Sequence, residues 1–404
     1  MGLFAGCMGG GNGNGNGGNG GNGGNGGNGN GDEPIRIGSL QPMSGTFSVY
    51  GPAHDAGMEF AAEQINADGG VLGRDIEIET VDTASSAQDA VTSFTRMIEQ
   101  DGIVAAGGPG SSEVGIQAGQ VADDMEVPLF MHASGAASVV PPDSRYRFRT
   151  ALAATTTTIE AQRQIIEQND YTDIALIYED GEWGYEYEAA VNEMFPSDIN
   201  LESDFAPIPE NDFIPYLRDM SDEVDMFLGA AHPAGVNSIV EQMAEIGMET
   251  EVFVGAITPM AATYGALGDH VENFVAFNQV DPHSDYYAEV GSAYYEAEGE
   301  FFDTAESAGY ATVEIIAQAV EEAETDDPSV VGDTIREGSF DTLFAAPVEY
   351  TEWGDLTNTV QVYNGFEVGE APEYYPDGEF SPVEYFRSDP IEGVNPEELG
   401  MLDL

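Results

Sequence analysis

The sequence predicts an α/β protein with two lobes, each built on a parallel β-sheet that helices cover on both faces. Short apolar runs alternate with amphipathic stretches from residue 35 onward, and this alternation is typical of βαβ units with a parallel sheet. The same alternation begins again after Arg149 and Thr150. About 370 residues remain after the first thirty, which is enough chain for two domains.

The first βαβ series occupies residues 35–131. Apolar residues recur at helical spacing between 52 and 65, and the turn-forming stretch 66–70 ends that helix. Residues 76–81 alternate between apolar and polar side chains, as expected for a strand. By the same criteria we expect further strands at 35–40, 103–106 and 127–131, and further helices at 87–100 and 114–125.

The second series begins at residue 156. Apolar periodicity also predicts a later helix over 308–322, and residues 346–368 are rich in strand-forming side chains. The acidic segment beyond 370 has no clear period, and we expect it to run over the surface. The elements of the second series are expected as helices at 156–168, 184–195 and 236–246 and as strands at 174–178, 226–229 and 252–254.

The charge balance indicates the surroundings of the protein. The sequence has 74 Asp and Glu residues against 10 Arg and no Lys, for a formal net charge of −64. Such a surface repels nucleic acid and anionic membranes, because both are bound through cationic side chains. Salt screens the self-repulsion over about 8–10 Å at ordinary ionic strength and about 3 Å at 1 M. Since 42% of the residues are hydrophobic, we interpret the chain as a globular protein adapted to molar salt, as in extreme halophiles, and not as an acidic disordered chain.

The N-terminal residues predict an anchored tether. Residues 8–32 are almost entirely Gly and Asn, a composition that forms flexible coil. The single cysteine, Cys7, follows Phe-Ala-Gly directly before this stretch and so resembles the lipidated cysteine of a lipoprotein signal. Position 4 holds Phe where Leu is usual, and the apolar run is too short for a signal peptide. We therefore expect residues 1–7 to be the end of a truncated signal.

Several motifs follow one another in a specific order. The most specific is Asn-Ala-Asp-Gly-Gly-Val-Leu-Gly-Arg at 66–74, after Pro-Met-Ser-Gly at 42–45 and Tyr-Gly at 50–51. Further matches stand at 82, 107–112, 127–128, 133–135, 183–184 and 232–233. From about residue 35 to residue 365, these motifs together resemble the branched-chain amino-acid type of periplasmic binding protein.

The resemblance implies the type I periplasmic-binding-protein fold, in which the chain crosses a hinge between two lobes three times. We place these crossings near Arg149, Phe277 and Pro347. The implied divisions are residues 33–149 and 278–347 for the first lobe, 150–277 and 348–370 for the second lobe, and 371–404 for an acidic C-terminal extension.

The resemblance also places a ligand site between the lobes, at the carboxyl ends of strands, where open α/β sheets bind ligands. By resemblance, Ser112 contacts a ligand carboxylate, with Ser111 as its neighbour, and the glycine-rich loop before them offers backbone N–H groups. These serines can cap the following helix as well, and the two roles coexist. Ala133, Ser134 and Gly135 match a loop that holds both ends of an amino acid, although Gly135 stands where the family usually has Thr.

On the second lobe, Trp183 matches an aromatic residue that closes over the ligand, and Ala231 stands where a further aromatic is common. Ile257 stands where the amino-acid binders carry an acid for the ligand's ammonium. A buried ammonium without a counter-charge is strongly unfavourable. We therefore expect either another acid, such as Asp281, or a ligand without an ammonium, namely an aromatic or aliphatic carboxylate or an amide.

The resemblance implies a lipid-anchored solute-binding protein of an ABC transporter on the extracellular face of the membrane. It would capture a small carboxylate-bearing solute, such as a branched-chain amino acid, by lobe closure and deliver it to permease subunits. The alternative is a ligand-sensing receptor of the same fold that acts through a partner.

An enzyme is disfavoured, and no cofactor or metal is expected. The chain lacks Lys for Schiff-base chemistry and lacks a G-x-S-x-G nucleophile elbow. Its five His residues are scattered without metal-ligand spacing. A single cysteine excludes an intrachain disulfide and a cysteine-based metal site, and no apolar run reaches the roughly 18–20 residues of a membrane span.

Overall fold

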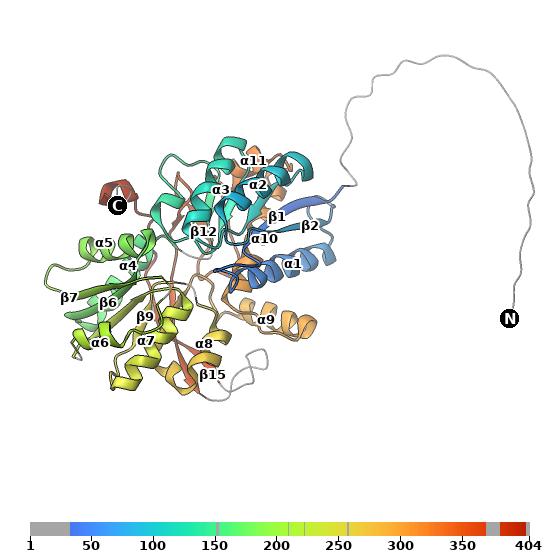
Figure 1. The fold of residues 1–404 in the computed structure, drawn as a ribbon. Coiled ribbons are helices and arrows are strands. Elements are labelled where there is room, and N and C mark those ends of the chain that lie inside the picture. The colour runs from blue at the N-terminus through green and yellow to red at the C-terminus, as the bar shows by residue number, and fades with distance from the viewer. Residues whose placement is uncertain are drawn as a thin grey trace, which may run out of the picture. The chain divides into compact units, whose positions relative to one another are not determined.

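The computed structural model describes residues 33–150, 153–208, 210–221, 223–256, 258–368 and 380–400. The predictions for residues 1–32, including the lipidation of Cys7, lie outside these ranges. In the described part the chain forms two lobes, each with its own large sheet (Figure 1). None of the helices in these ranges combines the length and the apolar character that a membrane span requires.

The first lobe is built on a sheet of five parallel strands in the order β2-β1-β3-β4-β5. Because parallel neighbours need a crossover connection, the intervening helices lie on the faces of the sheet. The strands are β1 (Ile35–Gln41), β2 (Ile76–Asp82), β3 (Ala105–Gly107), β4 (Leu129–Met131) and β5 (Arg147–Arg149). The helices between them are α1 (Gly51–Ala67), α2 (Ala87–Arg96), which continues as a π-helix over Met97–Asp101, and α3 (Ser112–Met125). The predicted first series is therefore confirmed.

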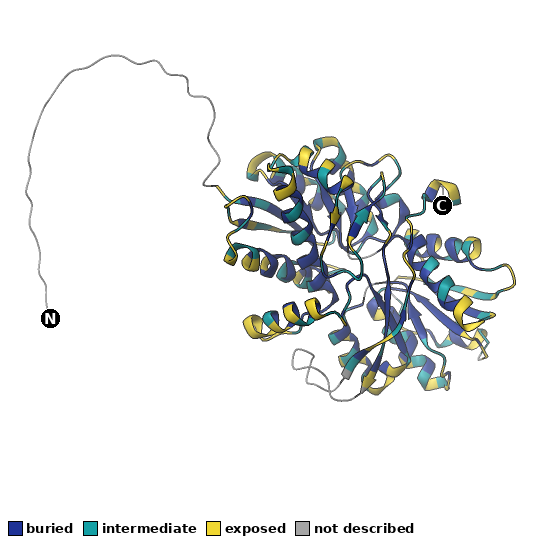
Figure 2. Ribbon diagram, turned by 180° about the vertical axis from the view of Figure 1, so that it is seen from behind, coloured by how far each residue is buried: buried dark blue, intermediate teal, exposed yellow. Residues whose placement is uncertain are grey.

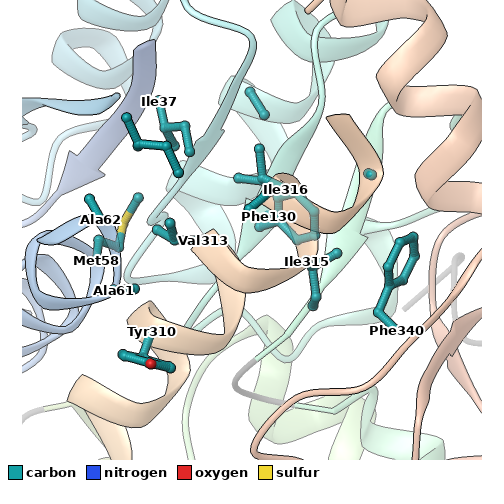
Figure 3. Close-up of a cluster of buried hydrophobic side chains, with 14 of the residues drawn as sticks. Ile37, Met58, Ala61, Ala62, Phe130, Tyr310, Val313, Ile315, Ile316 and Phe340 are labelled. Carbon is teal, nitrogen blue, oxygen red and sulfur yellow. The ribbon is translucent and has the colours of Figure 1, made fainter. Parts of the chain in front are cut away.

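Three later helices return to the first lobe and complete its core. They are α9 (Asp285–Glu298), α10 (Thr304–Ala323) and α11 (Pro328–Glu337). One apolar layer joins α1 and α10 to the sheet, and a second layer joins α2 and α3 to the other face. Figure 3 shows Val313 of α10 beside Met58 and Ala61 of α1, with Ile316 beside Phe130 of β4. Strands β1, β3, β4 and β5 are accordingly buried, whereas the edge strand β2 and the outer helix faces are partly exposed (Figure 2).

Helices α1 and α10 approach each other through glycines. A Cβ atom added at Gly57 would lie 1.9 Å from the backbone oxygen of Glu306, and one added at Gly309 would lie 2.0 Å from the backbone oxygen of His54. Neither position has space for a side chain, because the obstacle is backbone. The two glycines therefore determine how closely the helices pack.

A small antiparallel sheet belongs to the first lobe and not to the second. It consists of β11 (Ser339–Phe340), β12 (Val348–Tyr350) and β13 (Leu356–Thr357). The buried side chains of Val348, Tyr350 and Leu356 lie in the core of the first lobe. This differs from a hinge crossing near Pro347, because strand-forming composition does not tell which sheet a strand joins. We propose that the third crossing lies between β13 and Val362.

The second lobe is built on a seven-stranded sheet in the order β15-β14-β10-β9-β8-β6-β7. Its parallel strands are β6 (Asp173–Glu179), β7 (Asn200–Ala206), β8 (Met226–Ala230), β9 (Val252–Val254) and β10 (Phe274–Asn278). Helices α4 (Thr155–Asn169) and α5 (Glu182–Met194) cover one face. The other face is covered by α6 (Ile214–Asp219), α7 (Pro233–Ile246) and α8 (Met260–Leu267).

The two C-terminal strands extend this sheet in the opposite direction. Strand β14 (Val362–Val368) pairs antiparallel with β10, and β15 (Phe380–Arg387) pairs antiparallel with β14. Residues beyond 370 therefore include an edge strand of the second sheet, where the sequence indicates no regular element. Pro382 weakens the sequence signal for a strand, and an edge position is where a sheet tolerates proline.

One carboxylate links the beginnings of two helices from different lobes. The side chain of Asp303 accepts hydrogen bonds from the backbone N–H groups of Met260 and Ala261 at the start of α8, at 2.9 and 2.8 Å. The same side chain accepts from Thr304 N–H, at 2.7 Å, and so caps α10. Burial raises the pKa of Asp303, while both helix dipoles favour its charged form.

We predict that Gly57→Ala lowers the free energy of unfolding by about 1–3 kcal/mol, because the added methyl group meets the backbone of α10. Gly265→Ala is the matched control, since Gly265 lies exposed in α8 and nothing approaches the added atom within 4 Å. Alanine should raise helix stability there by about 0.5–1 kcal/mol. Urea unfolding in molar salt measures both, and equal midpoints for the two variants would contradict the glycine-mediated packing.

Candidate ligand-binding site

A cavity of about 370 Å³ lies between the lobes, at the carboxyl ends of their strands. This volume is within the range of small-molecule sites. The first lobe lines it with Phe47, Tyr50, Ser111, Ser112, Glu113, Ala133 and Gly135, and the second lobe with Glu179, Gly181, Glu182, Trp183, Gly184, Ile208, His232 and Ala256.

The structure brings most of the predicted site residues to this cavity. Ser111, Ser112, Ala133 and Gly135 lie on its first-lobe wall, and Trp183 faces them from the second lobe. Both predicted loops of the first lobe therefore reach the same wall, as their positions after β3 and β4 require.

The other predicted site residues do not line the cavity or are not described. Ser134 is fully buried beneath the wall, where its hydroxyl donates to the backbone oxygens of Pro109 and Ser111 at 3.1 and 2.9 Å. Ala231 is fully buried in the core of the second lobe. Asp281 pairs with Arg387 at 2.9 Å, away from the lining residues. Ile257 lies outside the described residues.

The first-lobe wall presents hydrogen-bond donors. Gly108 turns the chain from β3 toward α3 with a φ of +137°, and a Cβ atom there would lie 2.4 Å from the backbone oxygen of Leu40. Ser111 is the N-cap of α3, so the N–H groups of Ser112 and Glu113 lie in the first turn and have no acceptor within the helix. The hydroxyl of Ser112 also accepts from Ala136 N–H at 3.2 Å. This wall suits an anionic group.

A buried arginine holds the second loop of this wall in place. The guanidinium of Arg149 donates to the backbone oxygens of Ser134 and Ala136 and forms an ion pair with Asp355. Arg149 is fully buried, and Asp355 is nearly so. A desolvated guanidinium that donates charge-assisted hydrogen bonds to three different acceptors fixes geometry more firmly than single neutral hydrogen bonds do.

The second-lobe wall carries a carboxylate and aromatic rings. The carboxylate of Glu179, the last residue of β6, is hydrogen-bonded to Nδ1 of the His232 imidazole, and His232 is the N-cap of α7. The ring of Trp183, in the first turn of α5, lies 5.9 Å from the His232 ring. Phe47 from the first lobe lies 5.2 Å from the same His232 ring, so aromatic contact spans the cavity.

The electrostatics of the lining are acidic. Glu179 is 7% exposed, while Glu113 and Glu182 lie exposed at the rim. The described lining includes neither Arg nor Lys. Burial, together with the charge of Glu179, raises the pKa of Tyr50. The Tyr50 hydroxyl therefore stays protonated and can donate a hydrogen bond toward the acidic side of the cavity.

Glu179, His232 and Phe47 are among the lining residues that the sequence did not assign to the site. The available signal was position: Glu179 ends a predicted strand, and His232 directly precedes a helix-starting proline. Successive residues after a strand point to opposite sides, and here Ala231 enters the core whereas His232 reaches the cavity. The described residues contain no group of three or more His, Cys, Asp or Glu that could hold a metal ion.

Two buried histidines lie behind the cavity. The ring of His54 lies 6.0 Å from that of Tyr50 and 4.6 Å from that of His132. His132 contacts Gln41 and Thr312 through its two nitrogens, at 3.4 and 3.0 Å. Both histidines are fully buried. Burial lowers the pKa of His54 to about 3, and burial together with His54 lowers that of His132, so both rings are neutral.

Comparisons with known proteins agree with this architecture. Residues 34–367 match the family model described as periplasmic binding protein. The chain is 30% identical over 158 residues to the Leu/Ile/Val-binding protein homolog 8 of Brucella abortus (strain 2308), a match that spans 37% of this chain and 39% of that relative. It is 22% identical over 346 residues to the Leu/Ile/Val-binding protein of Escherichia coli (strain K12), spanning 83% and 90% of the two chains. The ABC transporter substrate-binding protein from Sphaerobacter thermophilus has the same fold, with a TM-score of 0.75, 21% identity, and coverage of 90% of this chain and 100% of that chain.

We predict that acidification destabilises the protein partly through His54. The pKa of His54 is about 3 in the folded protein, where the ring is buried, and 6.5 in the unfolded chain, where it is exposed. The unfolded state therefore binds more protons than the folded state between pH 3 and pH 6.5. Stability contributed by the neutral ring is therefore present above about pH 6.5 and is lost as the pH falls toward 3. The slope of the unfolding free energy against pH reports how many protons are taken up on unfolding. Between pH 4 and 6, His54→Leu should lower this number by about one.

Urea titrations in molar salt at several pH values measure this slope. His270→Leu, which removes an exposed imidazole from the second lobe, is the control. A slope that stays at the parent value in His54→Leu would show that the buried ring does not contribute.

Proposed function

This chain belongs to the periplasmic binding protein family, and we propose that it is the solute-binding component of an ABC transporter. Its ligand is a small zwitterion, in the simplest case an aliphatic amino acid, which it captures between its two lobes. The names of the Leu/Ile/Val-binding relatives support an amino-acid ligand. The observation that carries the proposal is the polarity of the cavity, with hydrogen-bond donors on one wall and a buried carboxylate beside aromatic rings on the other.

The carboxylate of the ligand binds to the first lobe in this proposal. The N–H groups of Ser112 and Glu113 and the hydroxyl of Ser112 supply donors, and the dipole of α3 favours a negative charge there. Gly135 leaves room beside them, because it has no side chain. A carboxylate can accept hydrogen bonds from all of these donors.

The cationic group of the ligand binds to the second lobe. Glu179 supplies the counter-charge that the sequence does not provide at Ile257, and Trp183 supplies an aromatic face, which attracts cations. Tyr50 of the first lobe supplies a further aromatic face to the same cavity. A ligand that carried only a carboxylate would meet the negative charges of Glu179, Glu113 and Glu182 without a compensating cation. The lining therefore favours a zwitterion over a simple organic acid.

Capture proceeds by closure of the lobes. The ligand docks on the wall formed by Ser112 and Ala133, and the lobe that carries Trp183 then swings over it about the hinge. Since the closed state makes contacts to both ends of the ligand, binding shifts the equilibrium toward closure. The closed form is the one that the permease subunits recognise, and no catalytic step takes place.

We predict that L-leucine binds more tightly than 4-methylpentanoate, which lacks the ammonium, and than 3-methylbutylamine, which lacks the carboxylate. Glu179→Gln should weaken L-leucine binding by about 1.5–3 kcal/mol, the value of a hydrogen bond to a charged group, and should leave 4-methylpentanoate binding unweakened. Ser112→Ala should weaken both by about 1–3 kcal/mol. Calorimetry in molar salt measures these affinities, and Trp183 fluorescence reports closure independently.

The opposite ranking, with 4-methylpentanoate tighter than L-leucine and insensitive to Ser112→Ala, would refute the assignment of both walls. Recovery of the ligand intact after prolonged incubation separates binding from turnover, because an enzyme would consume it.

The proposal includes a lipid anchor at Cys7 on the extracellular face of the membrane, with residues 8–32 as the tether. The support is the sequence alone: one cysteine, placed directly before a Gly- and Asn-rich stretch. With about 25 residues, a flexible chain of this kind reaches roughly 25–30 Å.

We predict that Cys7→Ser releases the protein from the membrane fraction into the medium, since the lipid attachment requires the thiol. Expression in a haloarchaeal host followed by cell fractionation measures the distribution. Membrane retention of the variant equal to that of the parent would exclude the anchor.

A further inference from the structure

Helix α5 contacts the first lobe at a place beyond the ligand cavity. Its first turn carries Trp183 into the cavity, and its next turn carries Glu186, which is 1% exposed. The carboxylate of Glu186 accepts a hydrogen bond from the backbone N–H of Ala137 at 2.6 Å. One turn earlier, Glu182 accepts from the hydroxyl of Ser138 at 2.7 Å.

The segment that α5 contacts is continuous with the ligand-binding loop. Ala137 begins a short 3-10 helix, Ala137–Val139, directly after the loop that brings Ala133 and Gly135 to the cavity. Arg149 holds the carbonyl of Ala136 from one side, and Glu186 holds the next N–H group from the other. The loop is thus held by both lobes: the first lobe binds it through Arg149 and the Ser112 hydroxyl, and the second lobe binds it through Glu186 and through the Thr155 hydroxyl of α4, which donates to the backbone oxygen of Gly135 at 3.2 Å.

We propose that Glu186 is a positioning residue that latches the closed cavity, by holding the ligand-binding loop of the first lobe against the helix that carries Trp183, and that it couples closure to proton uptake. Opening the lobes breaks the bond between Glu186 and Ala137 and exposes the carboxyl group to water. The inference rests on the proposed lobe closure, but it does not depend on which ligand is bound.

The charged groups around Glu186 come from three elements. Arg149 of β5 attracts a negative charge on Glu186, although Asp355, from the turn between β12 and β13, already pairs with that guanidinium. Glu182 on α5 repels the charge. Burial dominates these effects and raises the pKa of Glu186 to about 7.

The direction of the coupling follows from where the group is buried. In the open state the exposed carboxyl has an ordinary pKa near 4.5, whereas in the closed state its pKa is about 7. The closed state therefore binds more protons between these values, and closure is favoured at low pH. As the pH rises through about 7, this contribution to closure is lost.

Spin-label distances test the latch without any ligand. In a Cys7→Ser background, Thr92→Cys on α2 and Glu245→Cys on α7 place one label on an exposed site of each lobe. With pKa values of about 7 in the closed state and 4.5 in the open state, the ratio of closed to open populations should fall by on the order of a hundredfold between pH 5 and pH 8. Glu186→Gln, which keeps an acceptor but cannot ionise, should abolish the contribution of this group to the pH dependence and raise the closed population at pH 8.

Two further variants distinguish the latch from a structural role. Glu186→Ala leaves the buried N–H of Ala137 without an acceptor, so the closed population should fall on the order of tenfold at every pH. Glu193→Gln, an exposed position of the same helix, should follow the parent. Glu306 and Glu314 of α10, whose pKa values burial raises to about 8 and about 7, titrate in the same range, so the difference between variant and parent is the diagnostic quantity.

A pH dependence in Glu186→Gln identical to that of the parent, or an unchanged distance distribution in Glu186→Ala with intact folding, would overturn the proposal. L-leucine titrations of the same labelled proteins separate it from the proposed function. If L-leucine does not bind but the Glu186 variants alter the distances as expected, the ligand assignment fails and the latch stands. If L-leucine closes every variant equally at pH 5 and pH 8, the latch fails and the ligand assignment stands.

Discussion

The buried guanidinium of Arg149 is the interaction on which the ligand-facing part of the structure depends. It joins the end of β5, the loop that contains Ser134 and Ala136, and Asp355 in the turn between β12 and β13. Trp353 donates to the same Asp355 carboxylate, and Tyr350 donates to the backbone oxygen of Arg149. Removing one partner of such a buried pair typically costs about 3–5 kcal/mol, because the other charge is left unpaired. The chain has ten Arg residues and no Lys, and one of these arginines is fully buried beneath the ligand-facing loop and fixes its position.

The ion pair between Arg149 and Asp355 explains why the small antiparallel sheet belongs to the first lobe. Strand composition alone could not reveal it, since β12 and β13 have the same apolar alternation as a strand of either sheet. The deciding contacts, those of Asp355 with Arg149 and of Tyr350 with Phe148, join residues about two hundred positions apart. Long-range pairing of this kind leaves no periodic mark in a sequence.

The elements with strong local signals could be predicted, and those without them could not. Helix α1 and strand β9 follow directly from apolar periodicity between turn-forming residues. Strand β7 was missed because it lies at the sheet edge with exposed, mostly polar side chains. For the site, the glycine-rich motif before Ser112 correctly indicated a position at the cavity, whereas the position of Glu179 at the cavity depends on its contact with His232 in space.

The acidity of the chain has a different meaning on the surface and in the cavity. On the surface, carboxylates remain hydrated and molar salt screens them. In the cavity, Glu179 is withdrawn from water beside the His232 imidazole, so under the proposed function a cationic group would gain more there than at a screened surface charge. Acidic residues occur throughout the sequence, but burial gives the carboxylate of Glu179 a stronger interaction with cations than the exposed carboxylates have.

The carboxylate of Asp303 links the stability of the two lobes. It caps α10, which packs in the first lobe, and it accepts the first N–H groups of α8, which packs in the second. The second lobe therefore obtains the acceptor for the first N–H groups of α8 from the first lobe. A fragment cut to the second lobe would therefore begin α8 without the carboxylate that accepts its first N–H groups, so this lobe is not complete by itself even though it has its own large sheet.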